Sequence, residues 1–156
     1  MKKSLIISLG AALLALLMSS CCPCRKQTNK NHKPMLSTEW RLVQLDGRNL
    51  TQEFDAQEQP RLIFAEDGSF GGYGGCNSLG GQYQLTPSEA LSQRDTAGKI
   101  TLGGLYSTKR YCPKDQVEMS LLKALSEVDA YTIEQNRLFL FANGELKIVL
   151  QAGEGN

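Results

Sequence analysis

The sequence predicts an α+β fold, in which a small, curved, partly barrel-like antiparallel β-sheet of about eight short strands packs against one α-helix. The runs between turn signals are short and rich in β-branched, aromatic and leucine residues, as strands are. One later segment has instead the periodicity of an amphipathic helix. Turn-forming pairs recur at Asp46-Gly47, Asp67-Gly68, Gln135-Asn136 and Asn143-Gly144.

We expect strands at residues 39–45, 60–66, 69–74, 81–86, 99–105, 130–135, 137–142 and 146–151. Two-residue turns separate the last three, so these should form a meander. The polar stretches 49–59 and 87–98 are predicted loops. Alternation along a strand places Leu62 and Phe64 on one face, and Phe139 and Phe141 likewise. Together with Trp40, these four side chains are the predicted core residues from the strands.

The helix is predicted over residues 113–128. Its apolar residues, Val117, Leu121, Leu125 and Val128, recur at steps of four, four and three, which traces a single stripe. Pro113 suits the first helical position. We expect the stripe to pack on one face or end of the sheet.

The N-terminus has the pattern of a lipoprotein signal peptide, residues 1–20. Two lysines precede an apolar run, from Leu5 to Met18, that is too short to span a membrane as a helix. Small residues then lead into Cys21, as in a lipobox, so we expect cleavage before Cys21 and attachment of lipid, including palmitate, to its thiol. An ordinary signal peptide cleaved nearby is the alternative.

Residues 21–35 are polar and basic, which is typical of a flexible tether between a lipid and a domain at residues 36–151. The last residues, 152–156, are a predicted disordered tail. From Pro34 onward the chain has 11 basic and 16 acidic residues, a net charge of −5, which argues against nucleic acid as a partner. The expected partners are the membrane, through the lipid, and an envelope protein or small molecule. No aspartate follows Cys21, which favours the outer membrane, facing the periplasm.

Residues 71–83, "GGYGGCNSLGGQY", lack the chemistry of the familiar glycine-rich sites. No lysine follows the last glycine, as a phosphate-binding loop requires, and the dinucleotide fingerprint lacks its third glycine. A nucleophilic Cys76 would need a base, and the single histidine, His32, lies in the tether. We therefore expect no catalytic residue, no cofactor and no metal site. Glycines in strands mark bends and bulges, and Asn77 suits a turn directly after Cys76.

The cysteines fit an oxidising compartment. With Cys21 lipidated, Cys22 and Cys24 belong to the tether, so Cys76 and Cys112 are the natural disulfide pair within the domain. A reactive redox thiol is the alternative, because Lys109 and Arg110 beside Cys112 would favour a thiolate.

These features together resemble the META domain, or HslJ-like heat-shock lipoprotein, family. The resemblance covers residues 36–151 and is carried by Trp40, Gly75-Cys76-Asn77 with Gly80 or Gly81 and Tyr83, Thr108 to Cys112, and Glu118. It implies a compact α+β domain, a linked pair of cysteines, and an association with the cell envelope and with stress or antibiotic tolerance. It implies no enzymatic reaction.

The function that we expect is therefore that of a non-enzymatic, membrane-anchored envelope lipoprotein, a binding or stability module in envelope stress or antibiotic tolerance. The alternative is a periplasmic inhibitor of a hydrolase such as lysozyme or a protease. Residues 106–111, "YSTKRY", would then be the inhibitory loop, because they are basic and aromatic on an acidic domain. The same segment is also compatible with a strand end that the disulfide pins.

Overall fold

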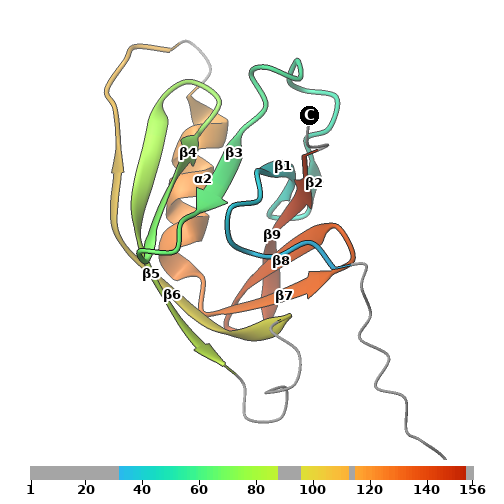
Figure 1. Ribbon diagram of the computed structural model, residues 1–156. Coiled ribbons are helices and arrows are strands. Elements are labelled where there is room, and N and C mark those ends of the chain that lie inside the picture. The colour runs from blue at the N-terminus through green and yellow to red at the C-terminus, as the bar shows by residue number, and fades with distance from the viewer. Residues whose placement is uncertain (1–31, 88–95, 113–114, 154–156) are drawn as a thin grey trace, which may run out of the picture.

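The computed structural model describes residues 32–87, 96–112 and 115–153, and its strands form an antiparallel barrel (Figure 1). The strand order is β2-β1-β3-β4-β5-β6-β7-β8-β9, and an additional pairing of β1 with β9 closes the sheet on itself. The predicted class, α+β with a small barrel-like sheet, is confirmed. The strands are β1 (Trp40–Leu45), β2 (Arg48–Asn49), β3 (Arg61–Phe64), β4 (Ser69–Tyr73), β5 (Ser78–Pro87), β6 (Ala97–Ser107), β7 (Ala130–Glu134), β8 (Arg137–Ala142) and β9 (Glu145–Ala152).

The four predicted turn pairs all lie between paired strands. At the β8–β9 turn Asn143 and Gly144 have φ values of 52° and 80°, the left-handed region that asparagine and glycine tolerate best. The meander of β7, β8 and β9 is confirmed. Residues 50–60 form the first predicted loop. The second predicted loop is shorter than expected, because Pro87 belongs to β5 and Ala97 and Gly98 belong to β6. Residues 88–95 lie outside the described part.

The core contains Trp40, Leu62 and Phe64, each at 0% exposure, as predicted. The prediction for Phe139 and Phe141 is wrong, because both are only half-buried while Leu138 and Leu140 fill the core from β8. As alternation predicts, the two phenylalanines share one face of β8, and the leucines lie on the opposite face. The strand is apolar on both faces, however, so alternation alone does not identify the face that points inward.

Helix α2 (Gln116–Glu127) packs against β6 and β1, and in Figure 1 it runs behind β3, β4 and β5, inside the curve of the sheet. It begins three residues later than predicted, and Pro113 lies outside the described residues. Leu121 and Leu125 of the predicted stripe are fully buried. Glu118, which the stripe did not include, is buried beside them at 3% exposure. Within the described part of the chain, no helix has the length and apolarity needed to cross a membrane.

The structured domain is longer than the predicted range 36–151 at both ends. Met35 is buried, and its carbonyl accepts a hydrogen bond of 2.9 Å from the buried indole N–H of Trp40. His32, assigned to the tether, is joined to the barrel, because its Nδ1 accepts a 2.9 Å hydrogen bond from the backbone N–H of Gln135. Ala152, assigned to the disordered tail, is a buried residue of β9 opposite Trp40. The barrel needs these extensions, because a buried indole N–H requires an acceptor and Trp40 requires cover. The predicted signal peptide, Cys21 and the tether up to residue 31 lie outside the described residues.

Candidate functional site

The glycine-rich stretch is a hairpin whose turn lies between β4 and β5. The backbone N–H of Gly74 donates to the carbonyl of Asn77 across the turn, at 2.8 Å. In this turn it is Gly75, with φ of 105°, that takes a backbone conformation with positive φ, which glycine tolerates best. A Cβ atom on Gly74 would lie 2.6 Å from Cγ of Glu118, so the absence of a side chain at Gly74 leaves space for the helix. The turn therefore brings Asn77 against the first turn of α2.

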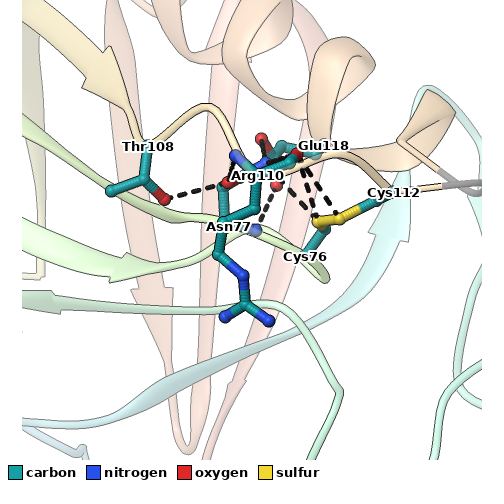
Figure 2. Close-up of a disulfide and its surroundings, with 6 residues drawn as sticks. All are labelled: Cys76, Asn77, Thr108, Arg110, Cys112 and Glu118. Atoms are coloured by element: carbon teal, nitrogen blue, oxygen red, sulfur yellow. Dashed lines mark hydrogen bonds between the residues drawn. A yellow bond between two sulfur atoms is a disulfide. The ribbon is translucent and has the colours of Figure 1, made fainter.

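Asn77 is the centre of a buried polar cluster (Figure 2). Its side chain is 4% exposed. On one side, its backbone N–H donates to Oε2 of Glu118 at 2.7 Å, and its Nδ2 donates to Oε1 at 3.0 Å. Both oxygens of the buried Glu118 carboxyl group are thus satisfied by a single residue 41 positions earlier in the chain.

On the other side, Asn77 holds the segment that follows β6. Its Oδ1 accepts two hydrogen bonds, from Oγ1 of Thr108 at 2.9 Å and from the backbone N–H of Arg110 at 2.8 Å. Its Nδ2 also donates to the carbonyl of Arg110 at 3.4 Å. An asparagine amide has two donors and one oxygen with two lone pairs, and here all of them are used. Neither aspartate nor leucine, although similar in size, offers that set.

Glu118 is the third residue of α2 and lies in its first turn, where the helix dipole favours a negative group. A buried carboxyl group is tolerated when hydrogen bonds replace its hydration, and Asn77 provides them. The burial of Glu118 was not predicted from the sequence. The signal was available, because Glu118 lies three residues before Leu121 and seven before Leu125, on the buried side of the helix.

A disulfide joins Cys76 to Cys112 beside this cluster, the pairing that the sequence predicts (Figure 2). The Cα atoms are 6.3 Å apart, within the usual range for a bridge, and the two residues are 36 positions apart in the chain. The bridge ties the β4–β5 turn to the segment that leads into α2. In the bonded state neither sulfur is a thiolate, so this geometry gives no support to the redox alternative.

The last two residues of β6 and the segment that follows it run across the cluster; residues 106–112 are called here the 106–112 loop. The N–H of Thr108 donates to the carbonyl of Ser78 at 2.9 Å, which continues the β5–β6 pairing. Beyond Thr108, the bonds to Asn77 and the disulfide at Cys112 fix the path of the backbone. Tyr111, at 94% exposure, points into solvent. Tyr106, Lys109 and Arg110 are also exposed.

A family model described as META domain matches residues 33–154. The chain belongs to the META domain family. The residues that carried the resemblance in the sequence include Cys76, Asn77, Thr108, Cys112 and Glu118, and the fold brings these five together around Asn77. In this META domain the signature is thus a buried connection between the β4–β5 turn, the end of β6 and α2.

Two solved structures are similar in fold. The NMR structure of a protein from Burkholderia xenovorans has a TM-score of 0.56 and 21% identity, with 78% of this chain and 85% of that chain covered. The crystal structure of a DUF4847 family protein from Bacteroides vulgatus has a TM-score of 0.51 and 15% identity, with 78% and 96% covered. At these identities the likeness shows the fold alone. No curated protein matches the chain.

Proposed function

We propose that this META domain chain is a non-enzymatic envelope lipoprotein, held to the membrane by lipid on Cys21, and that its domain binds another molecule in envelope stress or antibiotic tolerance. One observation carries the binding role. The polar side chains that mark the family bond to one another, and what they support is an exposed, braced loop. This arrangement suits recognition, because a surface fixed in its binding conformation loses little entropy when a partner docks.

The polar cluster is better suited to support than to chemistry. A catalytic group has to reach a substrate, whereas Asn77 and Glu118 are nearly inaccessible to solvent and already engaged with each other. In the bonded pair, Cys76 is also unable to act as a nucleophile. These residues support a stability role inside the domain, and the contacts with other molecules would come from the loop above them.

The lipid anchor is supported by the sequence at residues 1–21. Acyl chains on one cysteine provide enough buried methylene groups for stable attachment, at about 0.8 kcal/mol each. The basic residues of the proposed tether would lie beside anionic headgroups, while the acidic domain would be held away from them. The place of action would be the cell envelope, with the outer membrane, facing the periplasm, as the preferred site.

Metabolic labelling with an alkyne analogue of palmitate tests the anchor. We expect the full chain to be labelled and recovered with membranes, and the variant Cys21→Ser to be unlabelled. Cys22→Ser is the matched control, because it removes the adjacent thiol and should leave the labelling intact. Labelling that survives Cys21→Ser would exclude Cys21 as the lipid attachment site.

A deletion strain tests the binding role. Wild-type chain should restore survival under envelope-directed antibiotics, and a chain with Lys109→Ala and Tyr111→Ala should not, although it is equally abundant. Lys123→Ala, at an exposed helix position, is the control and should restore survival. Full rescue by the loop variant would show that the loop is not the contact surface.

A further inference from the structure

We propose that the 106–112 loop enters the active-site cleft of a trypsin-like serine protease as a substrate mimic, with Lys109 in the specificity pocket. This inference rests on the binding role proposed above and names its partner class, but it does not depend on the lipid anchor. It gives the hydrolase-inhibitor alternative a specific residue, a specific bond and a specific class of enzyme.

The first support is the way in which the loop is braced on both sides of Lys109. Thr108 and Arg110 both donate to Oδ1 of Asn77, at 2.9 and 2.8 Å, so one buried amide holds the residues before and after Lys109. Protease inhibitors that bind as substrates change shape little on binding, and their affinity depends on such preorganisation. Lys109 itself is exposed and has no bonded partner among the described residues.

The second support is that the backbone bonds favour Lys109, and not the neighbouring Arg110, as the residue in the specificity pocket. A residue in a specificity pocket needs its carbonyl group free, because the oxyanion hole of the protease binds that oxygen. The N–H of Arg110 is engaged by Asn77 at 2.8 Å, and its carbonyl accepts from Nδ2 at 3.4 Å. Among the described residues, the backbone of Lys109 makes no such bond. The geometry therefore assigns the pocket to Lys109 and places Arg110 on the leaving-group side.

The third support is charge complementarity. The specificity pocket of trypsin has an aspartate that accepts a lysine or arginine side chain. The loop places two adjacent cations on an acidic region, whose net charge from Pro34 onward is −5 with both cations counted. Tyr106 and Tyr111, 62% and 94% exposed, flank the cations and offer the aromatic contacts that protein interfaces favour.

The same bracing explains how the loop would inhibit an enzyme that is able to cleave it. The serine Oγ attacks the carbonyl carbon of Lys109, the bond to the Arg110 nitrogen breaks, and that nitrogen leaves as an amine carrying the serine's proton. Asn77 and the disulfide at Cys112 keep the amine next to the new ester. The amine then attacks the ester, which restores the peptide bond and the serine hydroxyl. Hydrolysis by water is slow in comparison because the leaving group never departs.

The test titrates the full chain, produced in an oxidising compartment and purified in mild detergent, against trypsin with a chromogenic lysyl amide. We expect inhibition, and we expect Lys109→Ala to weaken it about 100-fold. Lys109→Arg should stay within about 10-fold of the wild type, because the pocket accepts both cations. Lys123→Ala is the control for an exposed lysine outside the loop and should inhibit normally. Lys109→Phe should no longer inhibit trypsin and should instead inhibit chymotrypsin, whose specificity pocket is a hydrophobic slot.

Trp40 fluorescence and a thiol count establish that each variant is folded and bridged before it is assayed. The proposal is overturned by unchanged trypsin activity at about 10 μM folded wild type, a concentration far above the Kd values usual for protease inhibitors. Equal inhibition by Lys109→Ala also overturns it, as does rapid cleavage at Lys109–Arg110, seen by mass spectrometry, without lasting inhibition. Palmitate labelling is measured separately, so either proposal can fail while the other stands.

Discussion

Replacing Asn77 by alanine is the most direct test of the idea that one buried amide holds the site together. The substitution removes the acceptor that Thr108 and Arg110 share, and it removes the Nδ2 donor to Glu118. The backbone N–H of Asn77 still donates to the other oxygen of Glu118. The alanine side chain is smaller and causes no steric clash, so the decrease in the free energy of unfolding reports the lost hydrogen bonds and the groups left unpaired.

The magnitude follows from those bonds. Each neutral hydrogen bond to Oδ1 is worth about 1 kcal/mol, and the bond to a charged carboxylate about 2 kcal/mol. The substitution leaves one oxygen of the buried Glu118 carboxyl group without its donor, which adds to the loss of stability. We expect Asn77→Ala to lower the free energy of unfolding by about 4 kcal/mol, a large part of the stability of a small domain.

Urea denaturation followed by tryptophan fluorescence is a suitable assay, because Trp40 is the only tryptophan and is fully buried. Asn49→Ala is the matched control. The Oδ1 of Asn49 also accepts two hydrogen bonds, both from Thr51, but at an exposed turn, so we expect a loss below about 1 kcal/mol. The cluster would have no special energetic role if the two variants lost the same amount. A loss below about 0.5 kcal/mol for Asn77→Ala alone would refute the reasoning outright.

Three further predictions concern the rest of the fold. Gly72→Ala should prevent stable folding, because its Cβ would overlap the backbone of β3. Gly71→Ala is the matched control and should melt within a few degrees of the wild type, as measured by thermal denaturation. Replacing Cys76 and Cys112 together by serine should cost up to about 4 kcal/mol in urea denaturation, from the chain entropy released by opening the loop. Burial, followed by the charges of Asp67 and Glu66, raises the pKa of Tyr83. The folded state therefore holds the Tyr83 proton more tightly than the unfolded state does. The stability that this contributes is complete below about pH 10 and is lost as the pH rises further. Denaturation curves taken across the alkaline range should show this decline for the wild type and not for Tyr83→Phe.

The parts of the fold that were predictable are those that short stretches of sequence determine. Asn143-Gly144 specifies a tight hairpin turn through its own backbone preferences, whatever the rest of the chain does. Leu121 and Leu125 identify the buried side of a helix by their spacing alone. The pairing of Cys76 with Cys112 was also predictable, because only two cysteines lie within the predicted domain.

The parts that were not predictable depend on contacts between distant segments. β8 is apolar on both faces, so only its neighbours in the barrel determine that Leu140, and not Phe141, faces the core. Asn77 was interpreted from its local tendency to form turns, yet its environment is set by Glu118, 41 residues away. Met35 was assigned to the tether because the stretch before it is polar and basic, although Met35 is buried and its carbonyl accepts a hydrogen bond from Trp40 in the core. In each case the deciding partner lies on another element.

The separation between support and surface suggests how this domain type would serve different partners. The side chains that hold the loop, those of Asn77, Glu118 and Thr108, point into the cluster and are constrained by it. Lys109 and Tyr111 point outward and bond to nothing among the described residues. Substituting the outward residues therefore changes what the loop can contact without changing the bonds that hold it, so a chain with another residue at position 109 would keep the fold and bind a different partner. The Lys109→Phe variant tests this directly with a single substitution. A change of the inhibited protease from trypsin to chymotrypsin requires the loop to keep its shape while its specificity changes.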